Sequence, residues 1–331
     1  MANTYYQQRQ ALGSQVHIAL VSDAKPTIVN DLMRSFWLDI FLFEKRCSRF
    51  IHNSELSLFN RSAGNRQPVT AEFRDVLLAA RSMGRLTGGL YNPFVLPALQ
   101  QAGYKQSLVP EYSDDVHDDH STKRLVPVEA LEIGDDWASI PYGTAIDLGG
   151  CGKGFIGDVM AGRAEQTSQL LGYWFSVGGD VVTGGMDEHG QPWTVYISPH
   201  IKDLSESQRI GSATAPKDGG RFAVATSTVR FRKGQAEDGK MWHHIIDPRS
   251  GKPAETNVLL ASIAAKTLLE ADVLASCVII EGYPDAKAWL ADKAVDGLLV
   301  QTAGIAKGQP PIITDGGVIK AVSGTLDPKR L

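Results

Sequence analysis

Residues 144–158, TAIDLGGCGKGFIGD, combine an acid, a lysine and closely spaced glycines. Asp147 follows a short apolar run and is predicted to close a strand, and a helix is predicted to begin near Phe155. Glycines let backbone amides approach a ligand, and a helix N-terminus adds unpaired amides and a positive dipole end. Lys153 adds a full positive charge. The stretch is therefore a candidate site for an anionic group such as a nucleotide diphosphate.

Asp147 would repel a phosphate unless a divalent cation or a polar group lay between them, so this interpretation includes magnesium. A plain turn with a solvated lysine explains the residues equally well, because glycine-rich turns between strand and helix are common. Gly152, Gly154 and Gly157 also match the G-x-G-x-x-G pattern of dinucleotide-binding folds. That match lies in the middle of the chain, and only Asp180 stands near the place of the expected acid. These residues alone leave the three interpretations open.

Two further groups of residues could do chemistry. His243 and His244 could supply a general base at a strand edge, although such pairs more often hold one exposed and one backbone-bonded histidine. Asp272 and Ser276 are four residues apart, so a helix would place the carboxylate and the hydroxyl on one face. Hard oxygen ligands of this kind suit magnesium. Asp272 could equally be an acid favoured by the helix dipole. Residues 114–120 are acidic and histidine-rich, and are interpreted as a solvated loop.

Composition narrows the class of protein. The 331 residues are 43% hydrophobic and 21% charged, which is typical of a globular protein with a large core. A net charge of -4 offers no basic face for nucleic acid. Cys47, Cys151 and Cys277 are far apart and are predicted to be free thiols. No signal peptide or membrane span is recognisable, so the sequence as written is expected to be cytoplasmic, or periplasmic or membrane-anchored if a leader has been removed.

Helices and strands are mixed along the chain without strict alternation, which favours an α+β fold over a doubly wound one. We expect one domain over residues 1–331, or two closely packed α+β lobes. Strands are expected at 16–22, 173–182, 193–197, 221–227 and 259–264, and a hairpin at 137–147. Helices are expected at 28–47, 70–87, 97–102, 155–170, 268–281 and 285–293, and a loop with a short turn at 48–60.

Eight motifs follow one another in a fixed order over nearly the whole chain. They are SRF at 48–50, TGGLYNP at 87–93, IDLGGCGKG at 146–154, SVGGD at 176–180, Trp193 with Pro199, ATS at 225–227, HIIDP at 244–248 and ADVLAS at 271–276. Together they resemble the ApbE family of FAD:protein FMN transferases. The resemblance implies an α+β fold with mostly antiparallel sheets and flanking helices, and it makes the G-x-G-x-x-G match a coincidence.

The resemblance also implies a magnesium-dependent enzyme. Such an enzyme cleaves FAD at its diphosphate, attaches FMN to a threonine of an acceptor flavoprotein as a phosphoester, and releases AMP. His244 and Asp272 would be catalytic, and Asp272, Ser276 and the Gly150 carbonyl would hold Mg²⁺. Contacts to FAD would come from Leu12, Phe50, Leu90, Tyr91, Asn92, Asp147, Lys153, Thr226, Ser227, His244 and Ile245.

Five positions depart from the family pattern. Tyr91, Asn92 and Phe94 stand where phenylalanine, aspartate and threonine are usual. Thr228 stands in place of glycine, and Ser276 replaces a common threonine but keeps the hydroxyl. The changes at Asn92 and Phe94 favour an alternative, in which the protein binds FAD, or hydrolyses it slowly to FMN and AMP, without modifying a protein.

Overall fold

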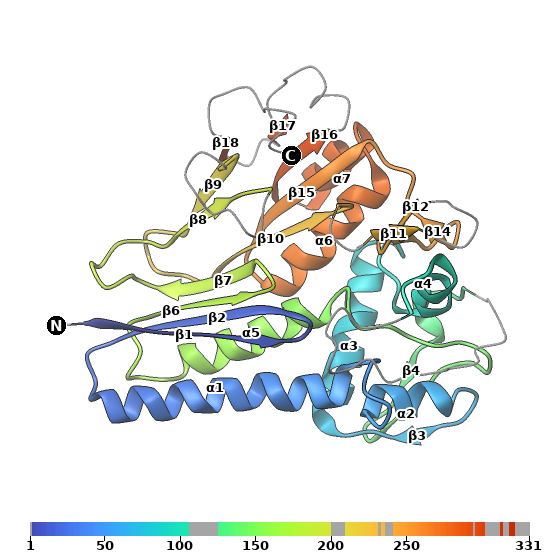
Figure 1. The fold of residues 1–331 in the computed structure, drawn as a ribbon, viewed down its shortest axis with the longest axis horizontal. Helices are drawn as coiled ribbons and strands as arrows, with labels where there is room; N and C mark the ends of the chain where they lie inside the picture. The colour runs from blue at the N-terminus through green and yellow to red at the C-terminus, as the bar shows by residue number, and fades with distance from the viewer. Residues whose placement is uncertain are drawn as a thin grey trace.

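An antiparallel sheet of eight strands forms the centre of the structure (Figure 1). The structure is a computed structural model that describes residues 2–105, 125–199, 209–230, 233–235, 241–293, 295–301, 312–313 and 318–321. In spatial order the strands are β1 (Asn3–Ala11), β2 (Ser14–Ser22), β6 (Gly172–Val177), β7 (Asp180–Gly185), β10 (Phe222–Thr228), β15 (Val258–Ala265), β16 (Asp296–Gln301) and β17 (Ile312–Ile313). Every neighbouring pair is antiparallel, which confirms the α+β class and excludes a doubly wound sheet.

Helices α1 (Pro26–Cys47), α5 (Gly152–Glu165) and α6 (Leu268–Glu281) pack on the sheet, and the other helices lie around them (Figure 1). The strands alternate their side chains between two faces. Phe175 and Ala223 enter the core beneath the helices, whereas Val224 enters a second core with Val195 and Ile197. That second core is covered by the small sheet of β8 (Thr194–Ile197), β9 (Gly211–Thr214) and β18 (Ile319–Ala321).

The remaining elements are one helix of 16 residues, several shorter helices, and strands of two or three residues. The helices are α2 (Glu55–Arg61), α3 (Ala71–Leu86), η1 (Pro93–Val95), α4 (Leu96–Ala102), η3 (Val128–Ala130) and α7 (Asp285–Lys293). The strands are β3 (Gln67–Pro68), β4 (Glu132–Ile133), β5 (Trp137–Ser139), β11 (Lys233–Gln235), β12 (Met241–His243), β13 (Ile246–Asp247) and β14 (Lys252–Pro253). Helices α2, α3 and α4 gather at the end of the sheet where the β1–β2 hairpin turns (Figure 1).

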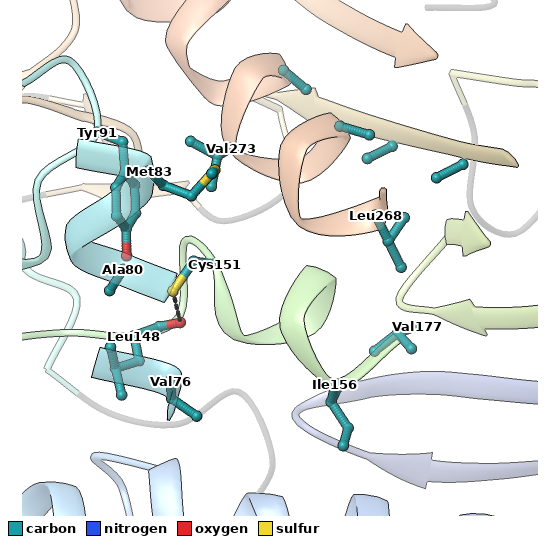
Figure 2. Close-up of a cluster of buried hydrophobic side chains, with 14 of the residues drawn as sticks. Val76, Ala80, Met83, Tyr91, Leu148, Cys151, Ile156, Val177, Leu268 and Val273 are labelled. Carbon is teal, nitrogen blue, oxygen red and sulfur yellow. Dashed lines mark hydrogen bonds between the residues drawn. The ribbon is translucent and has the colours of Figure 1, made fainter. Parts of the chain in front are cut away.

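A buried contact joins α3 to the segment before α5 and to α6. Figure 2 shows Ala80 and Met83 of α3 beside Leu148, Cys151 and Val273. The Cys151 thiol donates a hydrogen bond to the Leu148 carbonyl at 3.6 Å. All three cysteines of the chain are free and buried, as predicted. The contact fixes the chain immediately before α5 and thereby the place where that helix begins.

The boundaries of α6 and α7 match the predicted ranges. Thr267 caps α6 by accepting a hydrogen bond from the Glu270 amide, and Gly282 ends it with a φ of 73°. Both features can be recognised from the sequence, because a threonine cap and a glycine after the helix are local signals. None of the helices in the described ranges is long and apolar enough to cross a membrane.

The prediction for residues 137–147 is wrong. Only β5 forms there, paired with β3 and β4, and Asp147 does not close a strand. The Asn60 side chain explains this, because it accepts from the Ile146 amide and donates to the Ile146 carbonyl, both at 2.9 Å. A side chain thus satisfies the backbone that a neighbouring strand would otherwise pair.

Other predicted boundaries also need correction. Helix α5 begins at Gly152 instead of Phe155 and ends at Glu165 instead of near 170. The predicted loop at 48–60 contains the start of α2, where Ser54 accepts from the Ser57 amide at 3.0 Å. The strand predicted at 173–182 is two strands, β6 and β7, with two glycines of positive φ between them. Strand β1 was not predicted, because most of its side chains are polar and exposed.

Candidate active site

A cavity of about 950 Å³ lies where the β1–β2 hairpin, the start of α5, α6 and β10 meet. Every residue predicted for the site lines it, although the predicted roles remain predictions. The residues are Leu12, Phe50, Leu90, Tyr91, Asn92, Asp147, Gly150, Lys153, Thr226, Ser227, His244, Ile245, Asp272 and Ser276. The acidic stretch at 114–120 lies outside the described residues.

A buried cluster of charges forms one wall of the cavity. The Lys153 ammonium hydrogen-bonds to Asp180 Oδ2 and lies 3.5 Å from Asp272 Oδ1. The Gly154 amide donates to Asp272 Oδ2 at 3.2 Å, and the Thr226 amide donates to Asp180 Oδ1 at 2.9 Å. Burial raises the pKa of Asp272 to about 6, against the opposing effect of Lys153. Lys153, Asp272 and the start of α5 line the cavity, and Asp180 supplies the second carboxylate of the cluster without lining it.

Two glycines of the G-x-G-x-x-G match, Gly154 and Gly157, serve the contact between α5 and α6, whereas Gly152 lies against Phe43 of α1. A Cβ at Gly154 would lie 2.6 Å from the Leu269 Cα, and one at Gly157 would lie 2.5 Å from Leu268 Cδ2. The contact at Gly154 is with backbone, so a Cβ there would require a helix to move, whereas the contact at Gly157 is with the end of a leucine side chain. Since the sheet is also antiparallel, the pattern is not a dinucleotide-binding turn between parallel strands.

A second ion pair lies at another side of the cavity and includes a residue that was not predicted for the site. Arg49 Nε contacts Asp147 Oδ2 at 2.8 Å, and the Gly149 amide donates to Asp147 Oδ1 at 2.8 Å. The Arg49 guanidinium also lies 4.1 Å from the ring centre of Phe50 and 4.8 Å from that of Tyr104. Its presence in the SRF motif was the one signal available. Arg49 holds the Asp147 carboxylate in a fixed orientation.

The donors that could hold a divalent cation come from α6 and from the turn before α5. Asp272 and Ser276 are one helical turn apart, both line the cavity, and the Ser276 hydroxyl is 2.9 Å from that of Ser227. No group of three histidine, cysteine or acidic residues suited to a metal occurs in the described ranges. One carboxylate with hydroxyl and carbonyl oxygens, completed by substrate phosphates, is a donor set that suits Mg²⁺. The residues present therefore fit the predicted metal.

The two adjacent histidines have different surroundings. His243 Nε2 lies 3.0 Å from the Ala254 carbonyl, and its Nδ1 accepts from the Ile245 amide at 3.3 Å. Burial lowers the pKa of His243 and outweighs the bond to Ala254, so the ring is neutral at neutral pH. The expected backbone-bonded histidine is thus His243. His244 is the one that lines the cavity.

The departure from the family pattern at Asn92 has a structural reason. Asn92 Nδ2 donates to the Val126 carbonyl at 2.8 Å, and Oδ1 accepts from the Phe94 amide at 3.0 Å. An aspartate here would place an oxygen against the Val126 carbonyl. Phe94 is fully buried, so its side chain packs in the core and does not reach the cavity. Asn92 therefore fixes the chain after Tyr91, whose ring lies against Gly150.

A family model described as ApbE family matches residues 12–299. The chain belongs to the ApbE family. Among curated relatives, a protein of Salmonella typhimurium named FAD:protein FMN transferase is 28% identical over 232 residues, which cover 68% of this chain and 64% of that protein. A protein of Haemophilus influenzae with the same name is 23% identical over 284 residues, covering 82% and 79%. The match thus spans less than two thirds of the Salmonella protein.

Solved structures of ApbE-family proteins share the fold. The apo form of the Pseudomonas stutzeri flavinyl transferase ApbE superposes with a TM-score of 0.74 at 19% identity, covering 97% of this chain and 95% of that one. The ApbE protein of Thermotoga maritima gives 0.76 at 22% identity, covering 95% and 97%. At these identities the likeness establishes the α+β architecture.

Proposed function

We propose that this ApbE-family chain cleaves FAD at its diphosphate and transfers FMN to a threonine hydroxyl of an acceptor protein, with release of AMP. The observation that carries the proposal is the wall formed by Lys153, Asp272 and the start of α5, which shares one cavity with His244. The names of the curated relatives support the transfer of FMN from FAD to a protein.

The cavity suits a dinucleotide in size and charge. Its 950 Å³ lies at the upper end of the range for small-molecule sites, about 300–1,000 Å³. The N-terminus of α5 and the Lys153 ammonium would attract the diphosphate. Phe50 and Leu90 supply apolar surface for the rings of the ligand. Asp147, held by Arg49, would accept hydrogen bonds from a polar group of the nucleotide.

Asp272, Ser276 and the Gly150 carbonyl would hold Mg²⁺. When bound, the ion would neutralise charge on the diphosphate and on departing AMP. The carboxylate of Asp272 is already fixed by the Gly154 amide, so this donor is preorganised.

His244 would act as the general base. A threonine hydroxyl is a poor nucleophile at neutral pH and gains from a base that takes its proton as it attacks. The threonine oxygen would form the new bond to the FMN phosphorus, the bond from that phosphorus to the bridging oxygen would break, and AMP would leave with that oxygen. His243, bonded to the Ala254 carbonyl and to the Ile245 amide, fixes the backbone that carries His244.

FAD binding or slow hydrolysis without protein modification is the alternative. In the sequence it is favoured by the departures at Asn92 and Phe94. In the structure Phe94 is buried in the core, so only the change at Asn92 alters the cavity lining. In the hydrolytic form, water would take the place of the threonine, and the products would be FMN and AMP.

One experiment separates these functions. The protein is incubated with FAD, Mg²⁺ and an acceptor domain that carries a family-type Asp-(Gly/Glu)-x-(Ser/Thr)-(Gly/Ser)-Ala-Thr site, and acceptor mass and free AMP are measured. A covalent FMN adduct with stoichiometric AMP supports transfer. AMP without an adduct supports hydrolysis, and neither product supports binding alone.

The role of His244 is tested in the same assay. His244→Ala should keep its affinity for FAD and lose transfer by at least about 10²-fold, because the proton acceptor is removed. His52→Ala, which changes an exposed histidine outside the cavity lining, is the matched control and should leave the rate unchanged. Equal turnover by His244→Ala and the wild type would exclude the role.

A further inference from the structure

Lys153 shares its ammonium between carboxylates from two different elements. Asp272 belongs to α6 and is a proposed metal ligand, whereas Asp180 stands at the start of β7. Both are almost fully buried, at 4% and 2% exposure. The Lys153 ammonium contacts both of them. In the structure, therefore, a protein cation stands beside the carboxylate that would bind the divalent ion.

Backbone contacts hold the Asp180 carboxylate in place, in addition to its ion pair with Lys153. Its Oδ1 accepts the Thr226 amide, so that Oδ2 is left for Lys153. The turn before it has glycines of positive φ at Gly178 and Gly179, and Asp180 pairs with Val177 across the hairpin. The backbones of β7 and β10 thus set the place of this carboxylate independently of α6.

We infer that Asp180 is a positioning residue: its carboxylate keeps the ion pair with the Lys153 ammonium when a divalent cation binds to Asp272. Two cations beside one buried carboxylate repel each other strongly. The Lys153 ammonium must therefore move out of contact with Asp272 as the divalent ion binds. Asp180 offers a second carboxylate already in contact with the ammonium, and the move leaves no buried charge unpaired. The inference rests on the metal site in the proposed function.

The test is a double-mutant cycle on metal affinity in the absence of FAD. Binding of Mn²⁺ is followed from the EPR signal of the free ion for the wild type, Lys153→Met, Asp180→Asn and the double variant. Asparagine at 180 retains an oxygen for the Thr226 amide. Lys153→Gln is a second neutral variant in case methionine disturbs packing, and thermal unfolding confirms that each variant is folded.

We expect Lys153→Met to bind Mn²⁺ about tenfold more tightly than the wild type, because no ammonium has to leave Asp272. Asp180→Asn should bind Mn²⁺ about tenfold more weakly than the wild type. In the Lys153→Met background, the same substitution should weaken binding by a factor below about three. Lys252→Met removes an exposed lysine outside the cavity lining, and should leave the affinity unchanged.

Two results would overturn this inference while leaving the proposed metal site in place. In the first, neither Lys153→Met nor Lys153→Gln binds Mn²⁺ more tightly than the wild type. In the other, Asp180→Asn weakens binding by the same factor with and without Lys153, which would make Asp180 only one more negative charge. Asp272→Asn separates this from a failure of the metal site: unchanged Mn²⁺ binding by that variant would overturn the proposed site and the inference together.

Discussion

Helices α5 and α6 begin close together, yet their N-termini are satisfied in different ways. At the start of α6, Thr267 accepts from the Glu270 amide, and Asp158 accepts from the amides of Leu268 and Leu269, both at 2.9 Å. At the start of α5, the N-cap residue Cys151 makes no side-chain capping bond. Side-chain acceptors close the start of α6. At the start of α5 the Gly152 amide donates to the Leu148 carbonyl and the Gly154 amide to Asp272, and Lys153 lines the cavity.

The difference separates a structural helix start from one suited to binding. The acids Asp158 and Asp272 each accept amide hydrogen bonds from the first turn of the other helix. Asp158 uses both oxygens for this purpose and closes α6. Asp272 uses one oxygen for Gly154, and its other lies towards Lys153 and the cavity. An acid near a helix start therefore has no fixed role, and the rest of its contacts decide it.

The largest effect that the comparison predicts is at Asp272. Asp272→Asn should lower AMP release and FMN transfer by at least about 10²-fold, since the carboxylate proposed to hold Mg²⁺ is lost. Glu270→Gln, two residues earlier in the first turn of α6, is the matched control and should leave the rate within about twofold. Initial rates measured against Mg²⁺ concentration check both, and an unchanged magnesium titration for Asp272→Asn would exclude it as a ligand.

A change at the contact between the two helices should cost stability. Gly154→Ala should lower the free energy of unfolding by about 1–3 kcal/mol, because the new methyl group meets the backbone of Leu269. Gly162→Ala in the same helix meets only Arg221 at 3.5 Å and should raise it by about 0.5–1 kcal/mol. Urea unfolding measures the difference. Equal effects of the two alanines would show that the helices are not in close contact at Gly154.

Removing one oxygen acceptor at the closed N-terminus should also cost stability. Asp158→Asn retains one side-chain oxygen for two amides, so the free energy of unfolding should fall by about 1–3 kcal/mol. The rate of transfer by the folded protein should not change. A loss of activity without a loss of stability would contradict the structural role.

The smallest effect is a pH dependence at the same residue. Burial raises the pKa of Asp158, although the Leu269 and Leu268 amides and Arg221 oppose this. The folded state then binds the proton more readily than the unfolded state, so the contribution of Asp158 to stability falls as the pH rises above its unfolded pKa. An asparagine side chain does not titrate, so the stability difference between wild type and Asp158→Asn should shrink with rising pH in this window. A stability difference that grows with rising pH would contradict the predicted direction of the Asp158 pKa shift.

Local signals made much of the fold predictable. Helix α6 has a threonine cap and a following glycine, and its predicted range agrees with the structure. The start of α5 was placed three residues late, because Gly152 and Gly154 resemble a turn until their packing is known. Gly152 packs against Phe43, and Gly154 packs against Leu268 and Leu269. The segment before Asp147 was predicted as a strand, since nothing local reveals that Asn60 takes its hydrogen bonds.

The same distinction applies to the site. The predicted residues all line one cavity, because ordered family motifs identify them without reference to contacts. Arg49 and Asp180 were not assigned to the site, as their importance lies in long-range pairing with Asp147 and Lys153. The sequence also could not separate His243 from His244, because the carbonyl of Ala254 that holds His243 lies eleven residues further along.

The central claim is that the start of α5 binds the ligand and the start of α6 does not. Its most direct test is the dissociation constant for FAD, measured by flavin fluorescence without divalent cations for Lys153→Met and Asp158→Asn. We predict that Lys153→Met weakens binding by about tenfold or more, and that Asp158→Asn stays within about twofold of the wild type. Unchanged binding by Lys153→Met, or an equal loss in Asp158→Asn, would contradict the account.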